Sequence, residues 1–260
     1  MVAVTDSAIP IYFDVFGAIV LIWCGLPVPV LLYGLVGKDR TGRVGGRAWG
    51  PNVDPRWGWL FMELSALVVF PLVYLVAGQR HLVGDVLVGL WLAHYVHRTL
   101  VWPWFVQRQA RPFPAFTAVS GFCFNLVNGV LLGWFMARLA DYPVEWFWDP
   151  RFLAGAALFI AGAALNIASD YRLSSLRARA SGGAILPRGG GFDYVSCPNL
   201  AGEIVEWIGF ALMSWSLPGL AFALWTTANL IPRALWRHRW YQERFPDYPS
   251  NRRALFPGLL

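Results

Sequence analysis

Long apolar runs separated by short polar segments dominate the hydrophobic pattern of this chain. Five of them lie near residues 15–36, 57–77, 82–106, 115–137 and 152–169. Each has about the 20 residues that an α-helix needs to cross the hydrocarbon core of a bilayer. A sixth run, residues 200–231, is too long for one ordinary crossing, but the Ser-Leu-Pro-Gly sequence at 216–219 predicts a turn near its middle. The pattern therefore predicts an all-α integral membrane protein.

The positions of the basic residues predict how many helices there are and how they are oriented. With seven helices and the N-terminus outside, 17 of the 21 Lys and Arg residues lie in cytoplasmic segments, three lie outside and Arg98 lies within the third helix. With six helices the count is 11 against 9, which no longer favours one side. Because cytoplasmic loops carry the excess of Lys and Arg, we predict seven helices with the C-terminus in the cytoplasm.

Composition supports this prediction and limits the possible partners. The chain is 57% hydrophobic and 14% charged, and it has 15 Trp residues, which are typical of membrane interfaces. We expect one membrane domain spanning residues 1–260, monomeric and in contact with lipid. The net charge of +6 follows from the membrane orientation, so no nucleic acid partner is expected. All but one of the 21 basic residues are Arg, which favours a bacterial inner membrane over an endoplasmic reticulum.

Ionisable side chains inside the predicted helices are candidate functional groups, since each costs about 2.5 to 3.5 kcal/mol to insert. They are Glu63, Asp85, His94, His97, Arg98, Asp170, Glu203 and Glu206, and the amides Asn125, Asn128 and Asn166 accompany them. We interpret Asp85, Glu206 and the two histidines as structural pairing groups. No metal site is expected, because the four His and three Cys do not converge in sequence.

Spacing predicts which of these groups can act together, because residues three or four apart share a helical face. Asn166 and Asp170 satisfy this spacing. Asn199, Glu203 and Glu206 also do if their helix begins at or just before Asn199, which would then cap it. The Gly-rich, basic loops at 37–56 and 173–199 lie on the cytoplasmic side and are candidates to fold over a ligand.

Several segments resemble the steroid 5α-reductases, the 3-oxo-5α-steroid 4-dehydrogenases. The signature-like run SCPNLAGEIVEWIGFAL covers residues 196–212, and HYVHRT, NIASDYRL and WYQERFPDYPSNRRAL begin at residues 94, 166 and 240. A less specific piece, NGVLLGW, begins at residue 128. The likeness extends from about residue 57 to the C-terminus, with a signature region at about 166–260, whereas the first 56 residues match only as a helix and a loop.

The resemblance implies a seven-helix enzyme that reduces the C4–C5 double bond of 3-oxo-Δ4 steroids with NADPH. It places the ketone-binding pair at Glu63 and Tyr95. The cofactor-contacting positions that it implies are Asn166, Asp170, Arg177, Asn199, Glu203, Arg233, Tyr241 and Arg252, with Arg98 and Arg111 as weaker matches. Arg237 is also assigned to the cofactor, although relatives often carry a histidine there.

The residues themselves suit this chemistry. Hydride addition to an enone places negative charge on the carbonyl oxygen, so donors aimed at that oxygen lower the barrier most. Desolvation within the second helix keeps the Glu63 carboxyl protonated, which lets it donate a hydrogen bond beside the Tyr95 hydroxyl. Arginine pairs bidentately with phosphate, so Arg177, Arg233 and Arg252 are candidates for the cofactor phosphates.

Other functions remain open at this stage. A related membrane reductase of enoyl-CoA, a polyprenol or a sterol uses the same hydride chemistry. A methyltransferase that resembles the isoprenylcysteine carboxyl methyltransferases would bind S-adenosylmethionine, which has no phosphate for three arginines to hold. A lipid-binding protein without activity leaves the polar residues without a role, so NADPH binding separates the reductases from these two classes.

Overall fold

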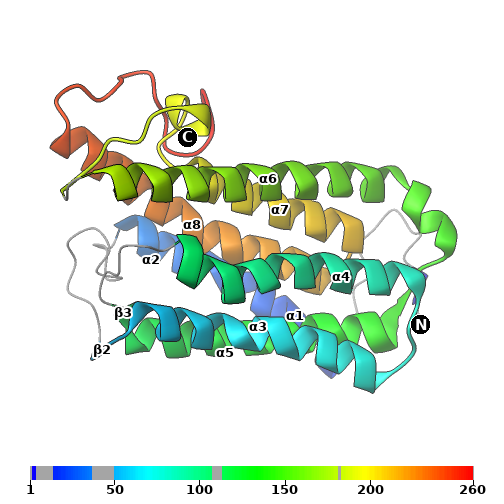
Figure 1. Ribbon diagram of the computed structural model, residues 1–260. Coiled ribbons are helices and arrows are strands. Elements are labelled where there is room, and N and C mark those ends of the chain that lie inside the picture. The colour runs from blue at the N-terminus through cyan, green and yellow to red at the C-terminus, as the bar shows by residue number, and fades with distance from the viewer. Residues whose placement is uncertain (1, 4–13, 37–49, 107–112, 181–182, 260) are drawn as a thin grey trace.

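Helices make up most of the computed structural model, which describes residues 2–3, 14–36, 50–106, 113–180 and 183–259 (Figure 1). The main helices are α1 (Val15–Gly25), α2 (Pro27–Val36), α3 (Pro55–Ala77), α4 (Leu82–Val96), α5 (Ala115–Trp134), α6 (Pro150–Arg179), α7 (Pro198–Ser214) and α8 (Leu217–Arg244). Two π-helical segments, η1 (His97–Val106) and η2 (Phe135–Leu139), extend α4 and α5, and η3 (Val144–Trp148) and η4 (Gly190–Asp193) are 3-10 turns.

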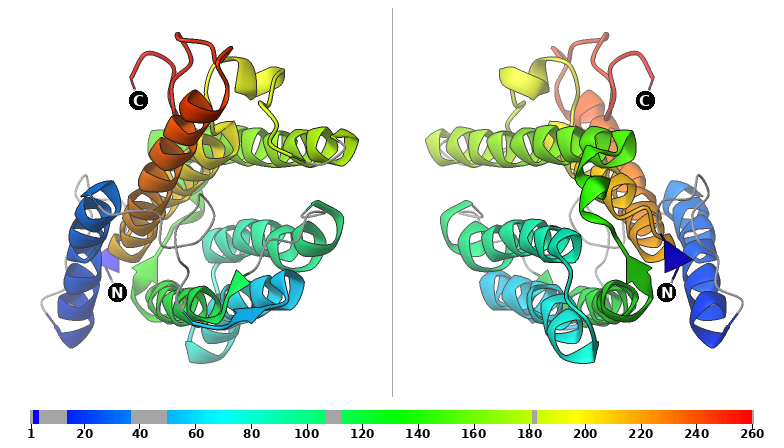
Figure 2. Two further views of the ribbon diagram at one scale, coloured as in Figure 1. Left: turned by 90° about the vertical axis from the view of Figure 1, so that its left-hand side faces the viewer. Right: turned by 90° about the vertical axis from the view of Figure 1, so that its right-hand side faces the viewer.

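Two short strand pairs complete the secondary structure of the described residues. Strand β1 (Val2–Ala3) lies parallel to β4 (Ala140–Asp141), and β2 (Asn52–Val53) lies antiparallel to β3 (Phe113–Pro114). The end-on views show α3, α4 and α5 as one group, α6, α7 and α8 as a second group, and α1 with α2 beside α8 (Figure 2). The cavity described below lies where these groups meet.

Within the described part of the chain, four helical spans are long and apolar enough to cross a membrane, namely Val15–Val36, Pro55–Ala77, Ala115–Leu139 and Pro150–Arg179. The helix pair α4–η1 carries Asp85, His94 and Arg98, and α8 ends in a run of basic residues, so these segments are more polar overall. The apolar helices make the chain an integral membrane protein.

The long apolar run at 200–231 folds as two helices, as predicted. Helix α7 ends at Ser214, Trp215 adopts a left-handed φ of 39°, and α8 begins at Leu217. Ser216 caps α8, because its side chain accepts a hydrogen bond from the Gly219 backbone nitrogen at 3.1 Å. A serine cap followed by proline in the first helical turn is a typical helix start, and here it reverses the chain direction.

Helix α6 is longer than the apolar pattern predicted. The prediction ended at residue 169, whereas α6 continues to Arg179, so the first residues of the loop assigned to 173–199 are helical. Hydropathy marks only the part of a helix that suits hydrocarbon, and residues 170–179 are largely polar. This polar extension places Asp170 and Arg177 on the same rigid element. Most of the other predicted loop, 37–56, lies outside the described residues.

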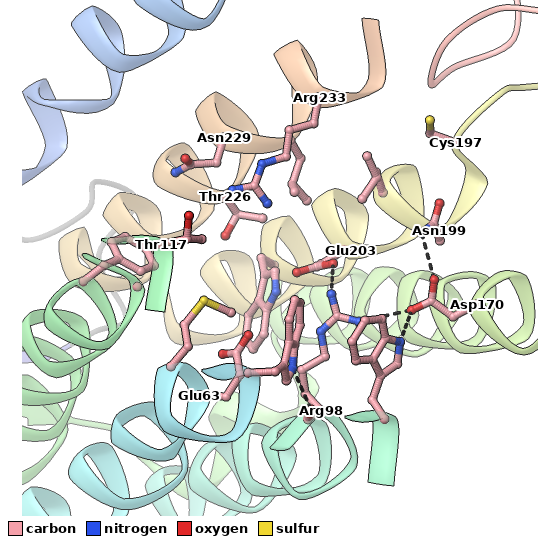
Figure 3. Close-up of a pocket in the computed structure, with 18 of the residues that line it drawn as sticks. Glu63, Arg98, Thr117, Asp170, Cys197, Asn199, Glu203, Thr226, Asn229 and Arg233 are labelled. Carbon is pink, nitrogen blue, oxygen red and sulfur yellow. Dashed lines mark hydrogen bonds and ion pairs between the residues drawn. The ribbon is translucent and has the colours of Figure 1, made fainter. Parts of the chain in front are cut away.

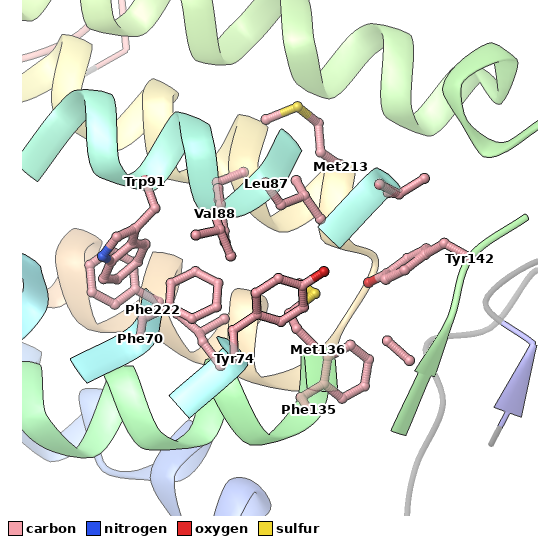
Figure 4. Close-up of a cluster of buried hydrophobic side chains, with 14 of the residues drawn as sticks. Phe70, Tyr74, Leu87, Val88, Trp91, Phe135, Met136, Tyr142, Met213 and Phe222 are labelled. Atoms are coloured by element: carbon pink, nitrogen blue, oxygen red, sulfur yellow. The ribbon is translucent and has the colours of Figure 1, made fainter. Parts of the chain in front are cut away.

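A cluster of aromatic side chains fills the bundle at one end of the cavity (Figure 4). Trp91 of α4 is fully buried, and its indole nitrogen donates to the Ala66 carbonyl of α3 at 2.7 Å. Its ring lies 5.2 Å from Trp207 of α7 and 4.9 Å from Phe222 of α8. Trp207 and Phe222 also line the cavity, so this core forms its closed end.

Paired glycines allow α6 and α7 to pack closely. A Cβ atom built on Gly162 would collide with the backbone of Gly202 and Glu206, and one built on Gly202 would lie 2.5 Å from the Asn166 nitrogen. Gly155 and Gly209 form an equivalent contact one to two turns away. Small residues at such interfaces let membrane helices approach each other closely. The contact matters for the site, because Asn166 and Glu203 flank it.

We expect Gly202→Val to separate α6 from α7 and to abolish the polar contacts that join them. No side chain can relieve the clash, because the atoms that oppose residue 202 belong to the backbone. Overpacking of this kind costs typically about 1 to 3 kcal/mol. A lower thermal midpoint in detergent is the expected result. Gly89→Val, at an open position on α4, is the control, and equal loss in both variants would contradict the prediction.

Candidate active site

A cavity of about 710 Å³ runs between the helix groups and is lined by residues of α1, α3, α4–η1, α5, α6, α7 and α8 (Figure 3). This volume is typical of small-molecule sites, which span roughly 300 to 1,000 Å³. Aromatic rings line much of the wall, and polar side chains lie among them. They include Glu63, the group around Arg98 and Asp170, and Thr226, Asn229 and Arg233 of α8 (Figure 3).

Glu63 of α3 lies on the cavity wall with 8% of its surface exposed. The Asn125 amide nitrogen donates to Glu63 Oε2 at 3.1 Å and to the Met62 carbonyl at 3.1 Å. Tyr95 of α4 lines the same cavity and is 4% exposed. The buried carboxyl and the buried phenol therefore face one cavity from neighbouring helices.

Aromatic neighbours hold the Tyr95 ring in place. Its centroid lies 4.6 Å from the ring of Trp91, 5.0 Å from that of His94 and 5.9 Å from that of Trp207. The Glu206 carboxylate pairs with His94 Nδ1 at 2.7 Å, and both side chains are buried. This pair joins α7 to α4 beside the Tyr95 ring, and it is the kind of buried contact that was predicted for Glu206 and His94.

Arg98 of η1 lies between two carboxylates. Its guanidinium donates to Asp170 Oδ2 at 3.1 Å and to Glu203 Oε2 at 3.2 Å. The rings of Trp59 and Trp102 pack against each other with centroids 4.4 Å apart, and both lie on the same side of the guanidinium, each 4.9 Å from its carbon. The spacing of Arg98 to its two partners, 72 and 105 residues in sequence, explains why no local pattern could predict this cluster.

Asp170 and Glu203 receive further hydrogen bonds from the predicted amides. The Asn199 amide donates to Asp170 Oδ1 at 2.8 Å, and the Trp102 indole nitrogen donates to Oδ2 at 2.8 Å. Asn166 donates to the Asn199 carbonyl at 2.9 Å and, more weakly, to Glu203 at 3.5 Å. The three charged groups carry one net negative charge on the cavity wall.

Basic and phenolic side chains line the part of the cavity near the end of α8. The lining includes Arg177 of α6 together with Arg233, Arg237 and Tyr241 of α8. Tyr241 is 3% exposed. Burial raises the pKa of its phenol, whereas the nearby Arg237 guanidinium lowers that pKa. The cavity thus joins an anionic region to a cationic one.

Comparisons with known proteins agree with this arrangement. Residues 111–260 match the family model of 3-oxo-5-alpha-steroid 4-dehydrogenase. The chain is 45% identical over 212 residues to 3-oxo-5-alpha-steroid 4-dehydrogenase 2 of Sus scrofa, which covers 80% of this chain and 82% of the relative. It is 40% identical over 252 residues to steroid 5-alpha-reductase DET2 of Arabidopsis thaliana, covering 91% and 93%. The chain belongs to the steroid 5-alpha-reductase family.

Membership in this family confirms the resemblance of the signature segments and makes the protein an oxidoreductase of steroid metabolism. The three segments at 166–173, 196–212 and 240–255 all fall within the matched residues. A further relative, 3-oxo-5-alpha-steroid 4-dehydrogenase 1 of Mus musculus, is 42% identical over 233 residues and covers 86% of this chain and 91% of its own length. The relatives named here are eukaryotic.

The likeness also reaches further toward the N-terminus than the sequence analysis placed it. Residues 57–260 are 78% of the chain, so an alignment that covers 91% must include part of the first 56. The structure explains this, because Trp23 of α1 lines the cavity and donates from its indole nitrogen to Asn128 at 3.1 Å. Trp23 could not be predicted as a site residue, because an apolar run does not show which of its residues face inward.

Three of the predicted cofactor-contacting residues are not found on the cavity wall of the described structure. Asn166 is buried behind the cavity wall, where it supports Asn199 and Glu203. Arg252 is 3% exposed, does not line the cavity, and donates to the Pro187 carbonyl at 3.1 Å. Its guanidinium carbon lies 5.4 Å from the centroid of the Tyr248 ring. Arg252 thus connects the C-terminal segment to the loop that contains Pro187. Arg111 lies outside the described residues.

The expected cap at Asn199 is not formed. Helix α7 begins at Pro198, so Asn199 already lies within the first turn, and its side chain points to Asp170. Cys197 occupies the cap position without a side-chain hydrogen bond. The Asn199 amide bonds to the Asp170 carboxylate of α6 and not to the backbone at the start of α7. The predicted local contact is therefore replaced by a link between α6 and α7.

Asp85 and His97 occupy structural positions. Asp85 accepts hydrogen bonds from Tyr74 at 3.1 Å and from Arg80 at 3.1 Å, far along α4 from Tyr95. The His97 ring packs beside Tyr171 at 6.0 Å. The described residues contain no group of three or more His, Cys, Asp or Glu residues that could hold a metal ion.

A hydrogen-bonded cluster near the C-terminus was not found from the sequence. Ser196 Oγ lies 2.7 Å from His238 Nδ1 and 2.5 Å from the Tyr248 hydroxyl, which in turn lies 2.9 Å from His238 Nδ1. Ser196 also donates to the Arg253 carbonyl at 3.2 Å. The cluster ties α8 and the C-terminal tail to the segment that leads into α7. Ser196 lines the cavity, so this cluster supports its rim.

Acidification is expected to weaken this cluster. Burial, together with the positive charges of Arg253 and Arg252, lowers the pKa of His238 below its ordinary value. The folded protein therefore favours the neutral ring, so its stabilising effect is complete above the unfolded pKa of about 6.5 and is lost as the pH falls through the lowered value. Thermal midpoints should fall less between pH 7.5 and 5.5 in His238→Asn than in the unmodified protein. An identical pH dependence in both would contradict this assignment.

Proposed function

We propose that the protein reduces the C4–C5 double bond of 3-oxo-Δ4 steroids with NADPH to give 5α-dihydro steroids. The observation that carries the proposal is the single cavity that joins a buried carboxyl and phenol, at Glu63 and Tyr95, to a wall of arginines. The names of the relatives support the steroid class, since they are 3-oxo-5-alpha-steroid 4-dehydrogenases and steroid 5-alpha-reductases.

At the substrate end, Glu63 and Tyr95 are proposed to donate hydrogen bonds to the 3-oxo group. As the reaction proceeds, the carbonyl oxygen gains the negative charge of an enolate, and two preorganised donors stabilise that charge more than they stabilise the ketone. The Asn125 amide holds one carboxyl oxygen of Glu63, which leaves the other for the substrate. Water or a nearby acid then supplies the proton to the α-carbon.

The donor set on the opposite wall fits a phosphorylated dinucleotide. NADPH supplies the hydride in this reaction. Arg177, Arg233 and Arg237 are proposed to bind its phosphates, because guanidinium groups pair bidentately with phosphate oxygens. Glu203 and Asn199 are proposed to bind the ribose or the carboxamide of the nicotinamide half, whose N–H and O–H groups suit a carboxylate and a carbonyl.

Arg98, Asp170 and Tyr241 complete the proposed cofactor wall. Arg98 holds Glu203 and Asp170 in place through its two ion pairs, and Asp170 in turn orients Asn199. Asn166 and Arg252 are proposed to act as positioning residues, since neither lines the cavity.

We also propose that the chain crosses the membrane seven times, with the N-terminus outside and the C-terminus in the cytoplasm. The crossings are α1 with α2, α3, α4 with η1, α5 with η2, α6, α7 and α8. The placement of 17 of 21 basic residues in cytoplasmic segments supports the orientation. In this orientation the arginine wall faces the compartment that contains NADPH. A monomer in a bacterial inner membrane stays our prediction for the assembly and host.

The proposal is tested by NADPH oxidation with the purified protein in detergent and testosterone or progesterone as substrate. A 5α-dihydro product, identified by mass spectrometry against standards, is the expected result. Tight NADPH binding without turnover of any 3-oxo-Δ4 steroid would contradict the steroid assignment and favour an enoyl-CoA, a polyprenol or another sterol as the substrate. No NADPH binding by folded protein would contradict the cofactor assignment.

A further inference from the structure

The cavity has a strip of side chains in which two polar members, Thr226 and Asn229, have no part in the chemistry proposed above. It follows one face of α8, where Phe222, Thr226, Asn229 and Arg233 all line the cavity at spacings of three or four residues. Eleven residues of helix correspond to about 16 Å of cavity length. Phe222 marks the end near Tyr95, because its ring lies 4.6 Å from Trp207, which contacts Tyr95. Thr226 and Asn229 therefore lie progressively farther from the ketone end.

Thr226 is nine-tenths buried, yet its hydroxyl has no hydrogen-bond partner among the described residues. Threonine in a helix commonly bonds the backbone carbonyl four residues earlier. The next residue, Thr227, does so, since its hydroxyl donates to the Ala223 carbonyl at 2.8 Å. The Thr226 hydroxyl faces the cavity instead (Figure 3).

Asn229 adds an acceptor one turn farther along the strip. Its amide nitrogen donates to the Trp225 carbonyl of its own helix at 2.9 Å. This bond uses one of the two N–H groups of the amide, so the other N–H group can donate to a ligand and the amide oxygen can accept from one. Thr226 and Asn229 both line the cavity, one helical turn apart on α8 (Figure 3). A hydroxyl group on a ligand can accept from Thr226 and also donate to the Asn229 oxygen, whereas a carbonyl group can only accept.

We propose that Thr226 and Asn229 determine substrate specificity by recognising a hydroxyl group at the end of the steroid opposite its 3-oxo group. The inference rests on the proposed function. A steroid whose ketone reaches Glu63 and Tyr95, and which lies along α8, presents its far end to these two side chains. A substrate with an apolar far end buries the Thr226 hydroxyl without a partner, and such a loss weakens binding.

The test compares kcat/KM for testosterone, for the 17-ketone androst-4-ene-3,17-dione and for the 17-deoxy compound androst-4-en-3-one. These differ only at the far end of the nucleus. In the unmodified protein we expect the hydroxyl compound to exceed the deoxy compound by about tenfold, with the ketone between them. In Thr226→Val and Asn229→Leu this ratio should fall toward one, while the Kd for NADPH stays unchanged. In Thr226→Val, kcat/KM for the deoxy compound should also rise, because this substrate no longer buries an unpartnered hydroxyl.

Thr227→Val is the matched control, because its hydroxyl is satisfied within the helix and does not line the cavity. It should keep the ratio of the unmodified protein. A ratio that does not change in Thr226→Val and Asn229→Leu would overturn the inference, as would a change in NADPH affinity in place of the ratio. Turnover of all three steroids without preference overturns the specificity alone. Turnover of none of them overturns the proposed function itself.

Discussion

Glu63→Leu is expected to lower kcat by about a hundred- to a thousandfold, the usual loss when one oxyanion donor is removed. Leucine fills a similar volume in the buried site but offers no hydrogen bond to the developing enolate. Glu63→Gln should lose less, because its amide nitrogen can still donate, although more weakly than a carboxylic acid. The measurement is single-turnover NADPH oxidation at saturating steroid.

The Asn125 contact makes this series informative. Asn125 donates to one oxygen of Glu63, so a glutamine at this position is expected to place its own oxygen there and direct its nitrogen to the ketone. Tyr95→Phe serves as a companion variant and should lose activity in the same range. The Kd for NADPH should remain nearly unchanged in all three, since neither residue contacts the arginine wall. Full turnover in Glu63→Leu would remove this residue from the mechanism.

Glu203→Ala is expected to raise the Kd for NADPH by about 30-fold. The substitution removes a proposed cofactor contact and also takes one partner from Arg98, whose guanidinium is buried between Glu203 and Asp170. Truncating one member of a buried, hydrogen-bonded charge pair costs about 2 kcal/mol or more, and 1.4 kcal/mol corresponds to a factor of ten. Isothermal titration of the detergent-solubilised protein with NADPH measures this change.

Glu203→Gln is the control that separates charge from hydrogen bonding. Its amide oxygen can still accept from Arg98, so its Kd should lie between those of the unmodified protein and Glu203→Ala. The kcat at saturating NADPH and steroid should change little in either variant, because the ketone donors lie elsewhere on the wall. An unchanged Kd in Glu203→Ala, measured on folded protein, would show that this carboxylate does not contact the cofactor.

Hydropathy located the helices accurately where the bilayer alone determines their ends. The predicted run at 15–36 coincides with α1 and α2, and the run at 82–106 coincides with α4 and η1. It failed at the end of α6, because residues 170–179 leave the apolar region without leaving the helix. Asp170 and Arg177 belong to that extension, so the pattern that finds membrane spans underestimates the element that carries part of the site.

Spacing along one helix predicted shared faces but not partners. Asn166 and Asp170 lie on one face of α6, as their spacing indicated, and both contact α7. The partner of Arg98 could not be predicted in this way. Arg98 pairs with Asp170 and Glu203, whereas His94, one helical turn before it, pairs with Glu206. Only the packing of α4–η1 against α6 and α7 decides which charges meet.

The sequence by itself determined that the chain lies in a membrane, where its long helices begin, and which polar residues are costly enough to have a function. These properties depend on short-range physics, namely apolar length, helix-start residues and the cost of placing charge in hydrocarbon. The tertiary structure decided which of those residues share a cavity. In the structure Trp23 lines the cavity, Asn125 donates a hydrogen bond to Glu63, and Arg252 contacts the Pro187 carbonyl outside the cavity. Contacts of this kind between distant segments depend on side-chain packing, which no local pattern encodes.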